Sequence, residues 1–311
     1  MGVIAVAGGT GAMGRTIVEG LVRDGTHRVV ILARKTNPEK EAKIGARIVA
    51  VDYSDSDQIS TVLEANSIDT VISTLNSSFG IESELNLIRA ANQSTATKRY
   101  VANVWGITYT PEESKVFPAA EGKVQAMQAL GASSLEWTCF LTGFLSDYFV
   151  MPRGKSYMTP LVVLVDMVHN VAAIPGSGAV PVVLTYSFDI PKFVIRALAL
   201  DHWENEMYII GDKMTLNEVV ALAEEVKGTK FSVTQDSMDN LKAGRVTELP
   251  SHEAYYPYFP KEQMQGLLAF FGIMWESGKC SLEPAYTLNQ RFPDIETTSV
   301  RTLLESAWKG I

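Results

Sequence analysis

The chain has 311 residues, of which 46% are hydrophobic and 20% are charged, a composition that supports a large buried core and excludes a disordered chain. Its formal net charge of −8 and pI near 5.2 exclude a broad nucleic-acid-binding surface, because phosphate neutralisation needs clustered Lys and Arg. Two cysteines, Cys139 and Cys280, are too few for a disulfide framework, so we expect a reducing, cytoplasmic location. The four histidines have no ligand spacing and predict no metal site.

The first predicted elements are a buried strand at 3–7 and a helix at 15–23, with a glycine-rich turn between them. The turn reads Gly8-x-x-Gly11-x-x-Gly14, one residue longer before its second glycine than the dinucleotide fingerprint. Each glycine has its own role. Gly8 permits the tight turn, Gly11 lets phosphates approach backbone N–H groups, and Gly14 lets the helix pack against the sheet. An ordinary strand-to-helix turn is the alternative. The other turn residues predicted to contact a dinucleotide are Thr10, Ala12 and Met13.

A second predicted strand at 28–33 ends in Arg34 and Lys35, where the adenosine ribose of a bound dinucleotide is expected. A carboxylate at this position accepts the ribose hydroxyls of NAD, whereas a guanidinium can pair with the 2′-phosphate of NADP. Arg34 therefore favours NADP(H) as cofactor. The alternative is that both side chains are solvated loop residues.

Strand and helix signals then alternate, which predicts an α/β fold with a Rossmann-type, doubly wound parallel sheet. Ligand-binding residues are expected at the carboxyl ends of the strands, here Asp52 and the run Thr74, Leu75 and Asn76. Asp52 is equally well explained as a helix cap. The predicted strands are 48–51, 70–75, 99–104 and 135–141, and the predicted helices are 56–65, 82–92 and 119–130.

The pattern loosens after residue 141, where prolines and glycines mark loops. We predict an NADP-binding domain at 1–150, to which 180–212 returns, and a smaller, mostly helical substrate-binding region within 151–311. Segments 185–188 and 206–210 are expected to rejoin the sheet. A helix is predicted at 191–200, and the capping box Thr215-Leu-Asn-Glu218 predicts another at 219–226. Residues 278–311 have no assignable role.

Neither apolar segment of note predicts a membrane element. The N-terminal strand lacks the basic region of a signal peptide and is interrupted by glycines. The run 161–174 contains Asp166 and His169 and is shorter than the ~20 residues that a membrane-spanning helix needs. We therefore expect a soluble protein without membrane or nucleic-acid partners.

Several motifs resemble the NmrA-like and isoflavone-reductase-like group of atypical short-chain dehydrogenases, and its fungal members most. The resemblance covers nearly the whole chain and implies a Rossmann fold with NADP(H). The residues that carry it are Gly8-Gly-Thr-Gly-Ala-Met-Gly14, Arg34, Lys98-Arg-Tyr-Val-Ala-Asn-Val-Trp-Gly106, Lys123, Thr142-Gly-Phe-Leu-Ser-Asp-Tyr148 and Asp189-Ile190.

The Tyr-x-x-x-Lys pair of ordinary short-chain reductases is incomplete, because Ala119 stands four residues before Lys123. The resemblance implies that Lys123 is retained as the ionisable catalytic group, with reduction of conjugated or quinone-methide-like substrates. On a helix, Lys123 shares a face with small and apolar residues, and desolvation would lower its pKa. A lysine whose charged end reaches solvent at a helix edge is the alternative.

The segment after the fifth strand departs from the family's Pro-Ser-Glu-Phe-Gly run and reads Ala102-Asn-Val-Trp-Gly106. Asn103 can exchange hydrogen bonds with a substrate but cannot act as an acid or base near pH 7. Trp105 either walls a flat ligand or packs in the core. The resemblance places Gly143 and Phe144 at the nicotinamide. We expect Trp105, Phe144, Tyr148, Met151 and Tyr157 to line the substrate pocket, with a satellite hydrophobic core as the alternative.

These features predict an NADP(H)-dependent reductase that acts on an activated C=C or C=N bond of an apolar, aromatic small molecule in secondary metabolism, such as an alkaloid or phenolic. An iminium accepts hydride without a strong acid, so the missing tyrosine is tolerated. Two alternatives stay open: a cyclase that uses the same pocket, and a redox sensor that binds NADP(H) without turnover. We expect a monomer or homodimer.

Overall fold

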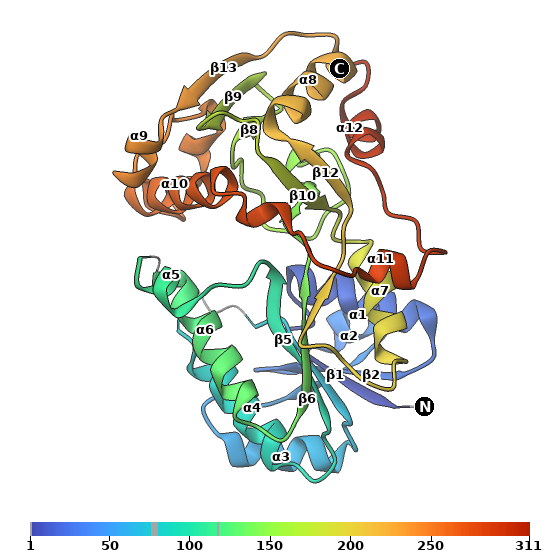
Figure 1. The fold of residues 1–311 in the computed structure, drawn as a ribbon. Helices are drawn as coiled ribbons and strands as arrows, with labels where there is room; N and C mark the ends of the chain where they lie inside the picture. Colours follow the sequence, from blue (N-terminus) through green and yellow to red (C-terminus); the bar gives the residue numbers. More distant parts are fainter. Residues whose placement is uncertain (1, 76–79, 117) are drawn as a thin grey trace. The chain divides into compact units, whose positions relative to one another are not determined.

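The computed structural model describes residues 2–75, 80–116 and 118–311 and divides the chain into two compact units (Figure 1). Unit 1 comprises Met1–Leu141 and Ile190–Ile209, and unit 2 comprises Thr142–Asp189 and Ile210–Ile311. The chain first passes from unit 1 to unit 2 after Leu141, nine residues before the predicted boundary at 150. The segment that returns to unit 1, Ile190–Ile209, is shorter than the predicted 180–212.

Unit 1 is built on a seven-stranded sheet in which every strand pairs in parallel, in the order β11-β6-β5-β4-β1-β2-β3. Strands covered on both faces read as continuous apolar runs, as Val3–Ala7 and Arg28–Ala33 do. The order reverses between β1 and β4, where ligands bind in such sheets. The predicted doubly wound sheet is confirmed. Its strands are β1 (Val3–Ala7), β2 (Arg28–Ala33), β3 (Arg47–Ala50), β4 (Thr70–Ser73), β5 (Arg99–Gly106), β6 (Glu136–Leu141) and β11 (Glu206–Tyr208).

Helices cover both faces of this sheet (Figure 1). One group consists of α1, α2 and α7, and the other of α3, α4 and α6 with α5 beside it. Gly20 allows the close contact between α1 and α7, because a Cβ there would meet the ring of Pro191. The helices are α1 (Ala12–Asp24), α2 (Pro38–Ile44), α3 (Ser56–Ala65), α4 (Glu82–Gln93), α5 (Pro111–Val116), α6 (Pro118–Gly131) and α7 (Ile190–Leu198).

Unit 2 is smaller and has more residues in helices than in strands, with two three-stranded sheets of orders β12-β10-β7 and β13-β9-β8. Its strands are β7 (Phe144–Leu145), β8 (Val165–Asp166), β9 (Val171–Pro175), β10 (Pro181–Thr185), β12 (Asp212–Thr215) and β13 (Ser232–Asp236). Its α-helices are α8 (Leu216–Lys227), α9 (Met238–Lys242), α10 (Lys261–Glu276), α11 (Leu288–Arg291) and α12 (Val300–Trp308). Its 3-10 helices are η1 (Ser146–Phe149), η2 (Pro250–Tyr255) and η3 (Lys279–Ser281).

The segments expected to rejoin the large sheet behave differently from each other. Residues 206–208 form β11 and pair with β6, as predicted. Residues 185–188 do not, because β10, which ends at Thr185, already pairs with β7 and β12 inside unit 2. The predicted capping box is present, since Thr215 Oγ1 accepts from Glu218 N–H and the Glu218 carboxylate accepts from Thr215 N–H. Among the described residues, no helix is both long and apolar enough to cross a bilayer.

The C-terminal residues, which have no role assignable from sequence, secure unit 2. Trp308 in α12 is buried, and its Nε1 donates to the carbonyl of Phe149 at 2.9 Å. The buried carboxylate of Asp189 accepts from Thr298 N–H at 2.6 Å, and Asp212 accepts from Val300 N–H at 2.6 Å. These bonds fasten α12 and the segment before it to the rest of unit 2.

Candidate functional site

The glycine turn between β1 and α1 has the shape of a phosphate cradle. Gly8 has a φ of +76°, which favours glycine, and Gly11 N–H donates to the Gly8 carbonyl at 2.9 Å. A Cβ on Gly14 would come within 2.5 Å of Thr74 Oγ1, so only glycine lets α1 approach β4 this closely. Gly11, by contrast, is exposed. The turn therefore packs tightly against Thr74 at Gly14 and is accessible to solvent at Gly11.

Among the described residues, no side chain caps the N-terminus of α1 at this turn. Gly11 is the N-cap and supplies no side-chain hydrogen bond, and the first turn contains no acidic residue. Thr10, Ala12 and Met13 are partly exposed there. The positive end of a thirteen-residue helix without a capping side chain favours an anionic group, so phosphate binding here stays a prediction.

Arg34 and Lys35 lie directly after β2 and are exposed. Within residues 2–75, 80–116 and 118–311, neither forms an ion pair or hydrogen bond. Next to them, Tyr53 is buried, and its hydroxyl donates to the Leu32 carbonyl at 3.0 Å. Burial raises the pKa of Tyr53, and the Arg34 charge acts in the opposite direction. Arg34 is thus a free guanidinium close to the glycine turn.

Asp52 does not cap a helix. It accepts hydrogen bonds from the N–H of Ser54 at 2.9 Å and its hydroxyl at 2.6 Å, and the hydroxyl bond most strongly lowers the pKa of Asp52. The N-cap of α3 is Asp55, which accepts from the N–H groups of Asp57 and Gln58. Of the two interpretations of Asp52, the cap is therefore wrong, and the cofactor role stays a prediction.

The residues after β4 tie that strand to its neighbours. Thr74 Oγ1 donates to the Ala7 carbonyl at 2.7 Å, which joins β4 to β1 beneath the glycine turn. Leu75 is partly buried, and its carbonyl accepts from the Asn103 side chain. Asn76, the remaining predicted cofactor contact here, lies outside the described residues.

A buried carboxylate, unnoticed in the sequence, connects β4 and β5. Glu84 of α4 accepts from the hydroxyls of Ser73 and Tyr100, the latter at 2.9 Å, and no cation pairs with it among the described residues. Burial raises the pKa of Glu84 to about 7, while hydrogen bonds from Ser73, Tyr100 and the Asn103 backbone oppose the rise. The network joins α4 to the last residue of β4 and to the first half of β5.

Hydrogen bonds to backbone carbonyls hold the side chains of Asn103 and Trp105 in β5. The Asn103 amide donates to the Leu75 carbonyl, and Trp105 Nε1 donates to the Ser73 carbonyl at 3.0 Å. Trp105 also stacks on Phe140, with ring centroids 5.6 Å apart and planes 9° apart. The packing role weighed for Trp105 is present. Because both side chains remain partly exposed, their substrate roles stay predictions.

Lys123 lies on α6 with its ammonium in a region poor in opposite charge. Burial lowers its pKa, with a smaller opposing effect from the Cys139 thiol, and Nζ lies 5.6 Å from the ring centroid of Tyr109. No ion pair to Lys123 occurs within the described parts of the chain. The residue as a whole is partly exposed. A lysine that loses its proton more easily can move a proton to or from a ligand.

The predicted nicotinamide contacts, Gly143 and Phe144, begin unit 2. Gly143 lies against the carbonyl of Val183, and Phe144 packs edge-on against Trp275, with ring centroids 4.7 Å apart. Phe144 also contacts Tyr148 at 5.3 Å. Within the parts of the chain that the structure describes, the hydroxyls of Thr142 and Ser146, on either side, are buried without a hydrogen-bond partner. Buried hydroxyls of this kind are rare and commonly face a ligand or water.

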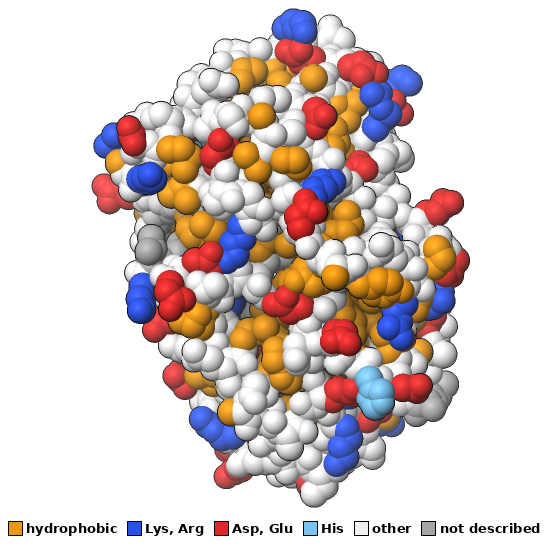
Figure 2. All heavy atoms as spheres, in the orientation of Figure 1, with side chains coloured by type: hydrophobic (Ala, Val, Ile, Leu, Met, Phe, Trp, Pro, Cys, Tyr) orange, Lys and Arg blue, Asp and Glu red, His pale blue; other side chains and the backbone are white. Residues whose placement is uncertain are grey.

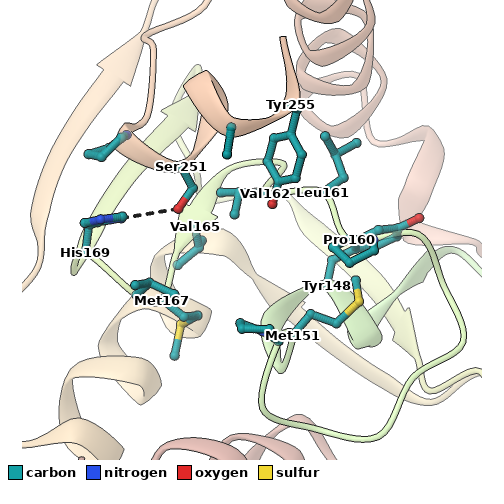
Figure 3. A pocket seen from close by; sticks show the side chains of 14 residues that line it. Tyr148, Met151, Pro160, Leu161, Val162, Val165, Met167, His169, Ser251 and Tyr255 are labelled. Carbon is teal, nitrogen blue, oxygen red and sulfur yellow. Dashed lines mark hydrogen bonds between the residues drawn. The ribbon is translucent and has the colours of Figure 1, made fainter. Parts of the chain in front are cut away.

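Unit 2 contains an apolar cavity of about 280 Å³, in which Tyr148, Met151, Val165, Met167 and Tyr255 form much of the wall (Figure 3). Its polar edge is made by His169 and Ser251, which hydrogen-bond to each other (Figure 3). Of the residues predicted to line a substrate pocket, Tyr148 and Met151 line this cavity and Tyr157 does not, and their contact with a substrate stays a prediction. Tyr157 instead packs on Phe188, with centroids 5.3 Å apart.

Sequence reasoning missed the residues that depend on tertiary contacts. Tyr109 stands fourteen residues from Lys123, and His169 is separated from Ser251 by more than eighty. Glu84 resembles a surface helix residue in sequence. Its position on the apolar face of α4, with Leu87 and Ile88, is the one available signal.

The fold and the glycine turn define a dinucleotide-binding type of α/β protein. The chain belongs to the NmrA-like family, whose model matches residues 1–292. It is 34% identical over 297 residues to "Oxidoreductase BOA1" of Botryotinia fuckeliana, covering 94% of this chain and 95% of that protein. It is 29% identical over 334 residues to "Oxidoreductase swnN" of Metarhizium robertsii, covering 99% and 98%.

Two solved structures have the same fold. One is the leucoanthocyanidin reductase–NADPH complex from Vitis vinifera, with a TM-score of 0.74 and 17% identity over 98% of both chains. The other is AtPrR2 with NADP⁺ and (+)-pinoresinol, with a TM-score of 0.74 and 19% identity over 97% of both chains. The predicted family and its Rossmann-type fold are thus confirmed.

Proposed function

We propose that this protein is an NADP(H)-dependent reductase of an activated C=C or C=N bond in an apolar, aromatic small molecule of secondary metabolism. The observation that carries the proposal is the pairing of an uncapped, glycine-lined helix N-terminus with the free guanidinium of Arg34 at the end of the neighbouring strand. A pyrophosphate fits the first feature and a 2′-phosphate the second.

The proposed cofactor contacts are the residues predicted for that role from the sequence. Gly8, Gly11 and Gly14, with Thr10, Ala12 and Met13, would receive the pyrophosphate. Arg34 would take the 2′-phosphate with Lys35 beside it. The remaining proposed contacts are Asp52, Thr74, Leu75, Asn76, Lys123, Gly143 and Phe144.

NADPH, when bound, supplies a hydride to an electron-poor carbon. Lys123 is the group in this chain that would give or take the proton that balances the reaction, because its pKa is lowered and no carboxylate neutralises it among the described residues. Reduction of an iminium needs no such proton, since the nitrogen's positive charge takes up the electron pair. Asn103 would orient a substrate without exchanging a proton.

The relatives support this class of chemistry. Both fungal relatives are named oxidoreductases, and the two solved structures are complexes with NADPH or NADP⁺. One of these complexes also holds (+)-pinoresinol, an aromatic ligand. The aromatic side chains around Phe144 and Tyr148 would suit a ligand of this kind. A cytoplasmic monomer or homodimer stays a prediction.

The test is NADPH consumption with two kinds of acceptor, cinnamaldehyde as an activated C=C bond and the 3,4-dihydroisoquinolinium cation as a C=N bond. When the NADPH is labelled with deuterium at the nicotinamide carbon C4, the deuterium should appear in the reduced product. If neither acceptor, nor a wider set of enones and iminium salts, is reduced by an enzyme that binds NADPH, the reductase proposal fails. Tighter binding of one redox form would then indicate a sensor, and cyclised product without NADPH consumption a cyclase.

A further inference from the structure

The cavity in unit 2 has a mostly apolar wall, which includes Tyr148 and Tyr255, and a polar edge. Met151, Val165 and Met167 contribute apolar side chains, and His169 and Ser251 are at the edge (Figure 3). Its volume of about 280 Å³ is near the lower end of the range of about 300–1,000 Å³ found for small-molecule sites. A cavity of this composition suits a compact apolar molecule that carries a single polar group.

The imidazole of His169 is held by a buried carboxylate. Its Nδ1 lies 3.0 Å from Oδ2 of Asp166, whose side chain is fully buried. Asp166 also accepts from the N–H groups of Val168 and His169 at 3.2 Å, and from that of Ser251 at 2.9 Å. Burial raises the pKa of Asp166, but hydrogen bonds from the side chains and N–H groups of Ser251 and His169 together lower it below its ordinary value, so the carboxylate is ionised at neutral pH.

An ionised carboxylate at Nδ1 places the imidazole proton on that nitrogen, which leaves Nε2 as a hydrogen-bond acceptor in the neutral ring. Nε2 has no partner among the described residues, and the His169 side chain is 47% exposed. The remaining partner of Nδ1 is Ser251 Oγ at 3.2 Å.

The same geometry excludes a hydrolytic triad. In a triad the carboxylate and the nucleophilic hydroxyl meet opposite nitrogens of the imidazole. Here Asp166 and Ser251 both meet Nδ1, so His169 cannot take a proton from Ser251 through Nε2. The cluster is therefore suited to binding rather than to acyl transfer.

The cavity wall is fixed on two sides. The buried ring of His252 accepts from Leu249 N–H at 3.2 Å through Nδ1, and its Nε2 lies 3.0 Å from the Val162 carbonyl. Together with the bond from Ser251 to Asp166, these contacts attach η2 to the segment that precedes β8. A preformed wall reduces the entropy lost when a ligand binds.

We propose that this cavity binds a hydroxyl-bearing apolar molecule whose O–H donates to Nε2 of His169, with Asp166 as the residue that positions the imidazole. The inference deepens the proposed function. It rests on that function in one respect, that the molecule bound in the cavity is the substrate. It assigns the substrate a free hydroxyl and makes His169 a specificity-determining residue.

The probes are 2-naphthol and naphthalene, which share a fused ring system and differ by one hydroxyl. Isothermal titration calorimetry without NADPH should show tighter binding of 2-naphthol to the wild-type protein. A neutral hydrogen bond corresponds to a preference of about three- to tenfold. In His169→Phe the preference should disappear through weaker binding of 2-naphthol, while naphthalene binding is kept. His202→Phe is the matched control, since His202 is 96% exposed and also lies beside a carboxylate, 3.9 Å from Glu136.

A separate measurement locates the bound probe. It uses the wild-type protein, so a misfolded variant cannot affect it. With methyl-labelled methionine, the Met151 and Met167 signals of the wild-type protein should shift on addition of 2-naphthol. The signal of Met207, which is buried in β11 of unit 1, should stay in place.

Three outcomes would overturn the inference: no saturable binding of 2-naphthol up to its solubility, binding that leaves the Met151 and Met167 signals unchanged, or an unaltered hydroxyl preference in His169→Phe. Each is independent of hydride transfer. A protein that passes these tests but never oxidises NADPH would retain the ligand site and lose the proposed reductase function.

Discussion

The hydroxyl of Tyr100 donates a 2.9 Å hydrogen bond to Oε1 of Glu84, a carboxylate that is buried in unit 1. Ser73 donates to its other oxygen. Since no cation neutralises Glu84 among the described residues, the network holds a proton near neutral pH. Ser73 is the last residue of β4, directly before Thr74 and Leu75, and Tyr100 is near the start of β5, so the network joins these two strands.

Replacing Glu84 with Gln should alter the pH dependence of stability. The folded pKa is about 7 and the ordinary value 4.5, so between these pH values the unfolded chain loses its proton first and stability falls as pH rises. The difference corresponds to about 3 kcal/mol, which the neutral amide avoids above pH 7. Urea unfolding at pH 5 and pH 8 should therefore show a smaller decrease for Glu84→Gln than for the wild-type protein.

Glu82→Gln serves as the control, because Glu82 is exposed on the same helix. Its unfolding curve should change with pH as the wild-type curve does. If Glu84→Gln also retained the full pH dependence, the buried network would not be the proton-binding group.

The large sheet was predictable because its strands carry their own signal. Both Val3–Ala7 and Arg28–Ala33 are continuous apolar runs bounded by polar or glycine residues, and the structure places them at the predicted positions. Ser56–Ala65 likewise coincides with α3, whose polar and apolar residues alternate with helical period. Local pattern and tertiary burial agree in these elements.

Unit 2 and its cavity were not predictable in the same way. Its strands are two to five residues long, too short to show a periodic pattern, and one apolar run at 161–174 contains β8 and all of β9 except Pro175. The cluster of Asp166, His169 and Ser251 depends on a contact between segments more than eighty residues apart. Tertiary contacts, not local preference, create this site.

Trp308→Phe should loosen unit 2 selectively. The substitution removes the bond from Nε1 to the Phe149 carbonyl and weakens the stacking of Arg153 and Lys227, which lie 5.2 and 4.9 Å from the indole. We expect the free energy of unfolding of unit 2 to fall by about 1–3 kcal/mol. Hydrogen exchange followed by mass spectrometry should show faster exchange in α12 and η1, with unit 1 unchanged.

A matched tryptophan in unit 1 provides the comparison for this experiment. Trp203 Nε1 donates to the Ala197 carbonyl at 2.9 Å, and Arg99 lies 4.8 Å from its ring. Trp203→Phe should accelerate exchange in unit 1 instead. Equal acceleration of both units by either variant would show that the two do not unfold independently.

Arg34→Ala should reduce affinity for NADPH about ten- to a hundredfold, the loss expected when a charge-assisted hydrogen bond is removed, and leave NADH affinity nearly unchanged. Fluorescence titration with both nucleotides gives the ratio. Arg23→Ala is the control, because Arg23 is an exposed arginine in the last turn of α1, remote from the glycine turn at its start. Equal losses for NADPH and NADH in Arg34→Ala would mean that Arg34 does not recognise the 2′-phosphate.

Lys123→Met should abolish turnover of a C=C acceptor while NADPH affinity stays within about tenfold, because the substitution removes a proton donor and keeps the length of the side chain. It should not lower stability, since the lysine is a desolvated cation with no carboxylate partner among the described residues. Stopped-flow single turnovers, nucleotide titration and thermal unfolding measure the three quantities.

Tyr109→Phe separates the lysine from the ring that it faces. The variant keeps the aromatic ring 5.6 Å from Nζ and removes only a hydroxyl, so turnover should remain close to the wild-type rate if Lys123 moves the proton. Loss of turnover in Tyr109→Phe, with activity retained in Lys123→Met, would assign the proton to the Tyr109 hydroxyl. That result would give the role of the absent short-chain reductase tyrosine to a residue from a different part of the chain.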